Sequence, residues 1–163
     1  MLRAEPNGGL IQLDFPNQPA AAAPLPEVLA AALGAPAVWS GRTATNWLVE
    51  LGDAATVRAL NPDLPGLAAC GTQGVIVTAA GDADSDFVSR YFAPAVGIPE
   101  DPVTGSAHCT LAPYWAPRFG RDEMVGHQVS ARGSRVGVRV AGDRVLLSGP
   151  AVTVITGSII GWV

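Results

Sequence analysis

The residues best suited to chemistry lie between Asp101 and Ser106, in the stretch Asp-Pro-Val-Thr-Gly-Ser. A carboxylate such as that of Asp101 can take up or return a proton as a general base or acid. Thr104-Gly105-Ser106 has the composition of a helix start, where the first backbone amides lack acceptors and carry partial positive charge. Glycine at position 105 also lets a ligand come close to the main chain. The pattern predicts an anion site at the start of a helix, with Asp101 beside the bound carboxylate.

Structural roles fit the same residues. Asp-Pro is a common turn opener, so Asp101 is equally suited to be the first residue of a turn. Thr104, Gly105 and Ser106 also suit a helix N-cap, and this role is compatible with an anion site because both use the same free amides. Glu100, next to Asp101, is expected to face solvent.

The elements that must position this stretch are a strand before it and a helix after it. Val88, Tyr91 and Phe92 favour an extended segment, and Pro94 to Pro102 is not expected to form regular structure. The helix is predicted over 107–112 after the Thr104 to Ser106 cap. Pro113 leaves its end open, because proline removes a backbone hydrogen bond inside a helix.

The rest of the chain predicts several strands and two short helices. Helices are expected at 26–33 and 54–60, the second capped by Asp53. Strands are expected at 9–15, 38–39, 47–51, 74–78, 86–92, 128–132, 135–140, 144–147 and 152–155. Many strands around one apolar helix indicate an α+β fold in which a curled, barrel-like, mostly antiparallel sheet surrounds the central helix.

Composition limits the function classes. The chain has 163 residues, 48% of them hydrophobic, which fits one domain with a sizeable core. Its ten basic residues are all arginine, so a lysine Schiff base, a pyridoxal phosphate anchor and a P-loop are excluded. A net charge of -4 with scattered arginines argues against binding of nucleic acid. Two cysteines and two histidines show no disulfide or metal-site spacing, so no metal is expected. No signal peptide or membrane span is recognisable, and a cytoplasmic location is expected.

The stretch from Arg90 to Ala107 strongly resembles the phenazine-biosynthesis (PhzF-like) proteins, relatives of diaminopimelate epimerase. Their signature runs Arg-x-Phe-Ala-Pro and then Gly-Ile-x-Glu-Asp-Pro-x-Thr-Gly-Ser-Ala, and this sequence follows it with almost no departure. The similarity extends to three further segments, namely Leu13 to Pro16, Leu111 to Trp115 and Gln128 to Gly133. It therefore covers nearly the whole chain.

The resemblance implies an isomerase that moves a proton between carbons of a small carboxylate without a cofactor. Asp101 would be catalytic, and Thr104, Gly105 and Ser106 would bind the substrate carboxylate. The fold would be that of diaminopimelate epimerase. Ser130 and Arg132 fit either the lining of the cleft or the ordinary polar alternation of a strand.

Length is the departure from the family. Residues 1–163 correspond to the second of two similar halves, a single domain in which 1–25 form a lead-in strand and an Ala/Pro-rich linker. The family's catalytic glutamate and a histidine lie in the first half and have no counterpart here. We therefore expect half of an active site, and a homodimer or a partner carrying the other half. The alternative is a non-catalytic binding or structural domain, either a truncated relic or one subunit of a split protein.

The remaining candidate side chains favour structural roles. His108 lies one turn into the apolar helix and is expected to be a hydrogen-bonded core histidine. Cys109, on the same helix, is expected to be a small buried residue. Cys70 stands in a sequence that imitates the cysteine motif of related epimerases, but a strand follows it instead of a helix. Catalysis by Cys70 is therefore not expected.

Overall fold

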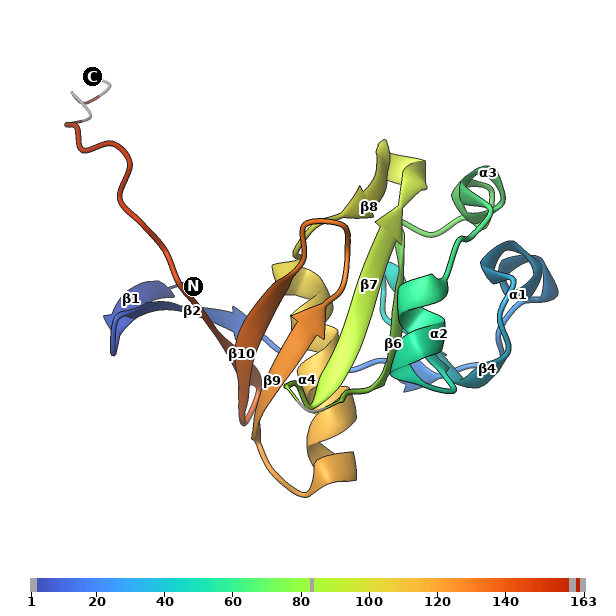
Figure 1. Cartoon of the computed structure of the whole chain (residues 1–163), viewed down its shortest axis with the longest axis horizontal. Coiled ribbons are helices and arrows are strands. Elements are labelled where there is room, and N and C mark those ends of the chain that lie inside the picture. The colour runs from blue at the N-terminus through green and yellow to red at the C-terminus, as the bar shows by residue number, and fades with distance from the viewer. Residues whose placement is uncertain (1–2, 83, 159–160, 162–163) are drawn as a thin grey trace.

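The longest helix, α4 (Gly105–Phe119), packs against one face of a curled, open sheet in the computed structural model, which describes residues 3–82, 84–158 and 161 (Figure 1). The other helices are short: α1 (Glu27–Leu33), α2 (Ala54–Ala59), α3 (Leu64–Ala68) and a 3-10 turn, η1 (Pro94–Val96). The strands are β1 (Arg3–Asn7), β2 (Leu10–Pro16), β3 (Ala21–Ala22), β4 (Ala37–Arg42), β5 (Asn46–Leu51), β6 (Gly74–Ala80), β7 (Phe87–Ala93), β8 (Ile98–Asp101), β9 (Glu123–Gln128), β10 (Ser134–Ala141) and β11 (Arg144–Gly149).

These strands form one mixed sheet in the order β1-β2-β11-β10-β9-β7-β6-β5-β4-β3, with β8 paired to β7. Within the described residues, only β5–β6 and β7–β9 are parallel pairs. The predicted α+β class and the mostly antiparallel sheet around a central helix are confirmed, although the sheet does not close into a barrel.

Alternation along the central strands builds two hydrophobic cores, one on each face of the sheet. In β5, Trp47 and Val49 join the core beneath α1, α2 and α3, whereas Leu48 joins the core around α4. In β6, Val75 and Ile76 divide in the same way. Side chains of a strand point alternately to its two faces, so each of these strands contributes apolar residues to both cores. Apolar side chains therefore cover both faces of the middle of the sheet.

Helix α4 continues through Pro113 and Pro117 and is longer than the predicted 107–112. A proline in a helix leaves the carbonyl four residues earlier without its usual partner. For Pro113 that carbonyl belongs to Cys109, and the backbone N–H of Gln18 donates to it at 2.9 Å. The predicted linker within 1–25 is therefore tied to α4. Gly120, with φ 65°, ends the helix in the left-handed conformation.

Most predicted elements are present, with shifted ends. The strands expected at 9–15, 38–39, 47–51, 74–78, 86–92, 135–140 and 144–147 correspond to β2, β4, β5, β6, β7, β10 and β11, and the helices at 26–33 and 54–60 to α1 and α2. The N-cap role of Asp53 is confirmed, because its Oδ1 accepts from the Thr56 N–H at 2.7 Å.

Three of the secondary-structure predictions are wrong. The strand expected at 128–132 is β9, which ends at Gln128, because Ser130 and Gly133 form a tight turn directly after it. Residues 94–102 are not irregular throughout, since they contain η1 and β8. Residues 152–155 form no strand, and their apolar side chains are exposed because no described segment runs beside them.

No helix in the described part of the chain is long and apolar enough to cross a membrane.

Candidate active site at the start of helix α4

Asp101 is the last residue of β8 and lies opposite Tyr91 of β7 in the register of the pair. It is half-buried, and its Oδ2 accepts a short hydrogen bond from the hydroxyl of Thr104. The Tyr91 hydroxyl donates to Asn46 Oδ1 at 3.0 Å. Burial raises the pKa of Tyr91, and the negative charge of Asp101 adds to this shift. The phenol therefore stays neutral beside the carboxylate.

The first turn of α4 presents two exposed residues, Gly105 and Ser106, directly after the buried Thr104. Thr104 occupies the predicted N-cap position, but its side chain makes no capping hydrogen bond, because its hydroxyl is directed to Asp101. The first amides of a helix have no acceptor inside the helix. Among the described residues, no group accepts a hydrogen bond from the backbone N–H of Gly105 or Ser106. These two donors are therefore available to an anion.

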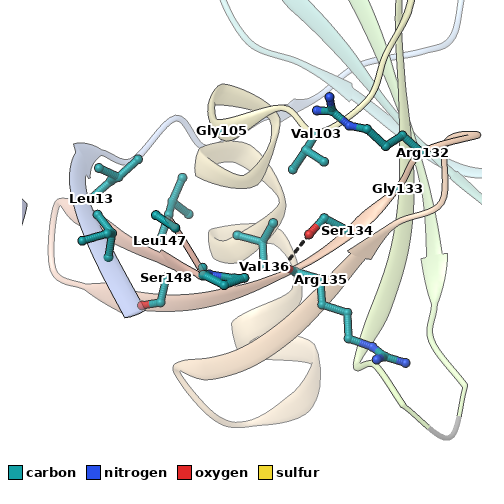
Figure 2. A pocket seen from close by; sticks show the side chains of 14 residues that line it. Leu13, Val103, Gly105, Arg132, Gly133, Ser134, Arg135, Val136, Leu147 and Ser148 are labelled. Carbon is teal, nitrogen blue, oxygen red and sulfur yellow. Dashed lines mark hydrogen bonds between the residues drawn. The ribbon is translucent and has the colours of Figure 1, made fainter. Parts of the chain in front are cut away.

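A cavity of about 530 Å³ opens beside Gly105. Arg132 and Val103 lie at the end of the cavity where α4 begins, and Leu13, Val136 and Leu147 supply an apolar wall (Figure 2). The other lining residues come from β2, the turn before β10, β10, β11 and the segment after β11: Ile11, Gly133, Ser134, Arg135, Ser148, Gly149, Pro150 and Ala151.

The structure thus brings the four predicted site residues into one corner, but only Gly105 lines the cavity. Asp101 and Thr104 are linked to each other, whereas Ser106 is exposed at the helix start. The sequence left open whether Ser130 and Arg132 line the cleft, and in the structure the two residues have different roles. Arg132 lines the cavity. Ser130 instead holds the loop, because its hydroxyl donates to the Pro102 carbonyl at 2.8 Å.

Glu100 was predicted to face solvent, but it does not. Its carboxylate forms a two-point ion pair with Arg90, at 2.7 and 2.9 Å. Nη1 of Arg90 also donates to the carbonyls of Val57 and Leu60, at the end of α2. Arg90 was visible in the sequence as the first residue of the family motif, but its role depends on contacts across the fold. The Arg90–Glu100 pair fixes the strand that carries Asp101.

Besides Arg90, Gln128 is a candidate functional residue that the sequence motifs did not indicate. Its side chain is fully buried and its Oε1 accepts from the Thr104 N–H at 2.8 Å. Nothing in the strand pattern separates this glutamine from an ordinary polar residue.

His108 is confirmed as a hydrogen-bonded core histidine. Its ring is fully buried, and Nδ1 lies 2.8 Å from the Thr104 carbonyl oxygen. Burial lowers the pKa of His108, so the ring is neutral near pH 7.

Both cysteines have environments that disfavour a thiolate. Cys109 is buried, as predicted, and burial raises the pKa of its thiol to about 11. Cys70 follows the end of α3 rather than opening a helix, and its thiol donates to the Gly66 carbonyl at 3.2 Å. Burial raises its pKa as well. Within the described ranges, no group of three or more His, Cys, Asp or Glu side chains is placed to hold a metal ion.

Comparison with known proteins gives relatives over almost the whole chain. Residues 12–157 match the PhzC-PhzF family, described as phenazine biosynthesis-like protein. The chain is 40% identical to an uncharacterized isomerase of Halalkalibacterium halodurans, covering 98% of this chain and 61% of that protein. It is 45% identical to an uncharacterized isomerase of Pseudomonas aeruginosa, covering 97% of this chain and 60% of the relative.

Solved structures agree with the sequence relatives. A PhzF-family protein of Enterococcus faecalis superposes with a TM-score of 0.87 at 37% identity, over 91% of this chain and 57% of that one. A putative phenazine biosynthesis PhzC/PhzF protein of Clostridium difficile gives a TM-score of 0.86 at 33% identity, over 98% and 61%. The chain thus spans roughly three fifths of these relatives' lengths, and the match to the family over residues 12–157, together with these relatives, shows that it belongs to the PhzC-PhzF, phenazine biosynthesis-like family.

Proposed function

We propose that this chain contributes one half of an isomerase active site, which moves a proton between two carbons of a small carboxylate. One observation carries the proposal. The Asp101 carboxylate is held by Thr104 immediately before the exposed amides of Gly105 and Ser106. A proton-transfer group and an anion site thus lie within one turn of each other. Membership of the family and the isomerase names of two relatives support the reaction class.

In this proposal the substrate carboxylate binds the Gly105 and Ser106 amides, where the helix dipole favours negative charge. Asp101 exchanges the proton of a nearby carbon through Oδ1, because Oδ2 already accepts from Thr104. The bond from carbon to hydrogen breaks as the bond from Oδ1 to hydrogen forms, and the electron pair stays on the substrate. Return of a proton to the other carbon needs a second acid, as in other paired acid and base sites.

The second acid is proposed to come from outside the 163 residues. By family resemblance it is a glutamate, carried in the part of the relatives that this chain does not span. The cavity beside Gly105 suits the rest of the substrate, because an apolar wall and the Arg132 guanidinium would bind a small molecule with an apolar body and an anionic group. A homodimer or a second chain would complete the site.

Binding is tested by titrating the ¹⁵N-labelled chain with a panel of small amino, hydroxy and unsaturated carboxylates. We expect the amide signals of Gly105 and Ser106 to shift together and to saturate. The Thr56 amide, at the start of α2, serves as the internal control. It already donates to the capping Asp53 side chain, so its signal should not shift. An absence of any response at Gly105 and Ser106 across the panel contradicts the anion site.

Turnover is tested by deuterium uptake from D₂O at the carbon that receives the proton, because Asp101 alone could exchange the proton of the carbon that loses it. The chain alone should be nearly inactive, because one positioned acid or base group is typically worth about 100 to 10,000-fold in rate. Activity should appear when a glutamate-bearing segment of a relative is added, and Asp101→Asn should abolish it while leaving the fold intact. Robust turnover by the chain alone that survives Asp101→Asn contradicts the proposal. Binding without any recovered turnover would instead favour a non-catalytic binding domain.

A further inference from the structure

Gln128, the last residue of β9, has all the hydrogen-bonding groups of its amide engaged by the Asp101 to Thr104 turn. Oε1 accepts from the Thr104 backbone N–H at 2.8 Å. Nε2 donates to the Asp101 carbonyl at 2.6 Å and to the Thr104 hydroxyl oxygen at 3.1 Å. The orientation of this amide is determined by its partners, because a backbone N–H can only donate and a backbone carbonyl can only accept.

This arrangement determines the direction of the Thr104 hydroxyl proton. A threonine hydroxyl has one proton to donate. Since Nε2 of Gln128 approaches Oγ1 as a donor, the hydroxyl proton is left for Oδ2 of Asp101, with which Oγ1 makes its short contact. Oδ1 accepts no hydrogen bond from any residue in the part of the chain that the structure describes. One amide therefore decides which carboxylate oxygen is occupied and which is available.

Gln128 also restrains the main chain on both sides of the turn. Its bonds reach the carbonyl of Asp101 at the end of β8 and the N–H of Thr104 just before α4. The side chain is fully buried, so water does not compete for these bonds. The Arg90–Glu100 ion pair holds the preceding residue of β8. Two sets of interactions from different strands, the Gln128 hydrogen bonds and the Arg90–Glu100 ion pair, thus hold Asp101 in place.

We propose that Gln128 is a positioning residue for Asp101, which presents Oδ1 to the substrate by orienting the Thr104 hydroxyl and clamping the turn. This inference rests on the proposed function of Asp101. Gln128 does not contact the Gly105 or Ser106 amides, so its loss should lower kcat and leave KM largely unchanged.

The test uses the completed enzyme, that is, this chain together with the glutamate-bearing segment. Gln128→Met keeps the length of the side chain but removes all three bonds. Gln128→Glu keeps an acceptor for the Thr104 N–H but, when ionised, has no proton to donate. Ser130→Ala is the matched control, because Ser130 bonds the adjacent Pro102 carbonyl in the same loop without reaching Asp101 or Thr104.

We expect both Gln128 variants to lose roughly 100-fold in kcat, the order of loss caused by misplacing a reacting group. KM should change by less than about threefold in both, and Ser130→Ala should stay within about threefold of wild type in both constants. Thr104→Val combined with Gln128→Met should lose less than the product of the two single effects, since both act through the same hydroxyl.

The outcomes separate the two proposals. Wild-type enzyme without turnover, or turnover that survives Asp101→Asn, overturns the proposed function and this inference with it. Turnover that is lost in Asp101→Asn but kept within about threefold in folded Gln128 variants overturns this inference alone. If neither variant folds, NMR on the wild-type chain decides, through a hydrogen-bond coupling between Gln128 Nε2 and the Asp101 carbonyl carbon. Absence of that coupling contradicts the clamp.

Discussion

His108 illustrates how one buried group can set the pH dependence of stability. Its Nδ1 is 2.8 Å from the Thr104 carbonyl oxygen, so this nitrogen carries the proton and donates. Its Nε2 has no hydrogen-bond partner among the described residues, and the Phe87 ring lies 6.1 Å away between centroids. Burial disfavours the imidazolium and lowers the pKa of His108, and the hydrogen bond to the Thr104 carbonyl, which favours the charged ring, offsets only part of this shift.

We predict that the free energy of unfolding falls as the pH drops below about 6.5, the unperturbed pKa of histidine. The unfolded chain takes up a proton there, whereas the folded chain does not because its pKa is lowered. The stabilising effect is therefore complete above the unfolded pKa and is lost as the pH falls toward the folded pKa. The slope should approach about 1.4 kcal/mol per pH unit for one proton. Urea denaturation between about pH 7 and about pH 5.5 measures it.

His108→Asn should flatten this slope, because an amide can still donate to the Thr104 carbonyl but does not titrate. The other histidine, His127, gives the control variant His127→Gln. Burial lowers the pKa of His127 and Arg135 adds to the shift, but His127 is only half-buried. Its removal should leave most of the slope. Equal slopes in wild type and His108→Asn contradict the assignment.

At the scale of elements, Arg90 joins β7, β8 and the end of α2. It pairs with Glu100 at two points and donates to carbonyls at the end of α2. The exposed fractions of the Arg90 and Glu100 side chains are 13% and 22%, so solvent screens this pair weakly. By contrast, the pair of Arg139 and Glu123 has fractions of 48% and 79%. The two pairs allow a matched comparison.

We predict that Arg90→Gln lowers the free energy of unfolding by about 3 kcal/mol, because it leaves Glu100 and the α2 carbonyls without their partner. Arg139→Gln should change it by less than about 0.5 kcal/mol, as expected for an exposed pair. Denaturant titration of both variants tests this, and hydrogen exchange should show faster opening of α2 in Arg90→Gln alone. Equal effects from the two variants would refute a special role for Arg90.

The elements that sequence predicted well have local causes. The apolar runs of β5 and β6, the Asp53 cap and the glycine stop of α1 are all encoded by residues near one another in the chain. The errors have distant causes. Helix α4 passes Pro113 because Gln18, far away in sequence, satisfies the carbonyl that this proline leaves free. Pairing with β7 makes a strand of β8 despite its proline.

The candidate site divides in the same way. The motif placed Thr104, Gly105 and Ser106 at a helix start with Asp101 just before it, and in the structure α4 begins there and Asp101 ends β8. Gln128 and the Glu100–Arg90 pair were not predicted, because their roles depend on hydrogen bonds between strands that meet only in the folded sheet. The direction of the Thr104 hydroxyl likewise depends on tertiary contacts.

At the scale of the whole molecule, the segment after β11 is the most apolar exposed feature. Val152, Val154 and Ile155 are 84%, 84% and 86% exposed. The segment leaves the sheet at the end opposite α1 (Figure 1). Its first residues, Pro150 and Ala151, border the cavity beside Gly105. Three large apolar side chains that are close in sequence and this exposed favour an interface with another chain.

We predict that the chain does not stay monomeric, because burying one valine or isoleucine side chain is worth about 1.5 to 3 kcal/mol. A two-fold dimer is the commonest outcome of such self-association. Sedimentation equilibrium at micromolar concentration should give a mass above the 16.6 kDa of one chain. Replacing Val152, Val154 and Ile155 by serine should shift the equilibrium toward the monomer. The matched control is Val28→Ser with Val38→Ser, which changes valines that are 68% and 67% exposed on α1 and β4 at the other end of the molecule. A single wild-type species near 16.6 kDa would contradict the prediction, and equal loss of association in both sets of variants would place the interface elsewhere.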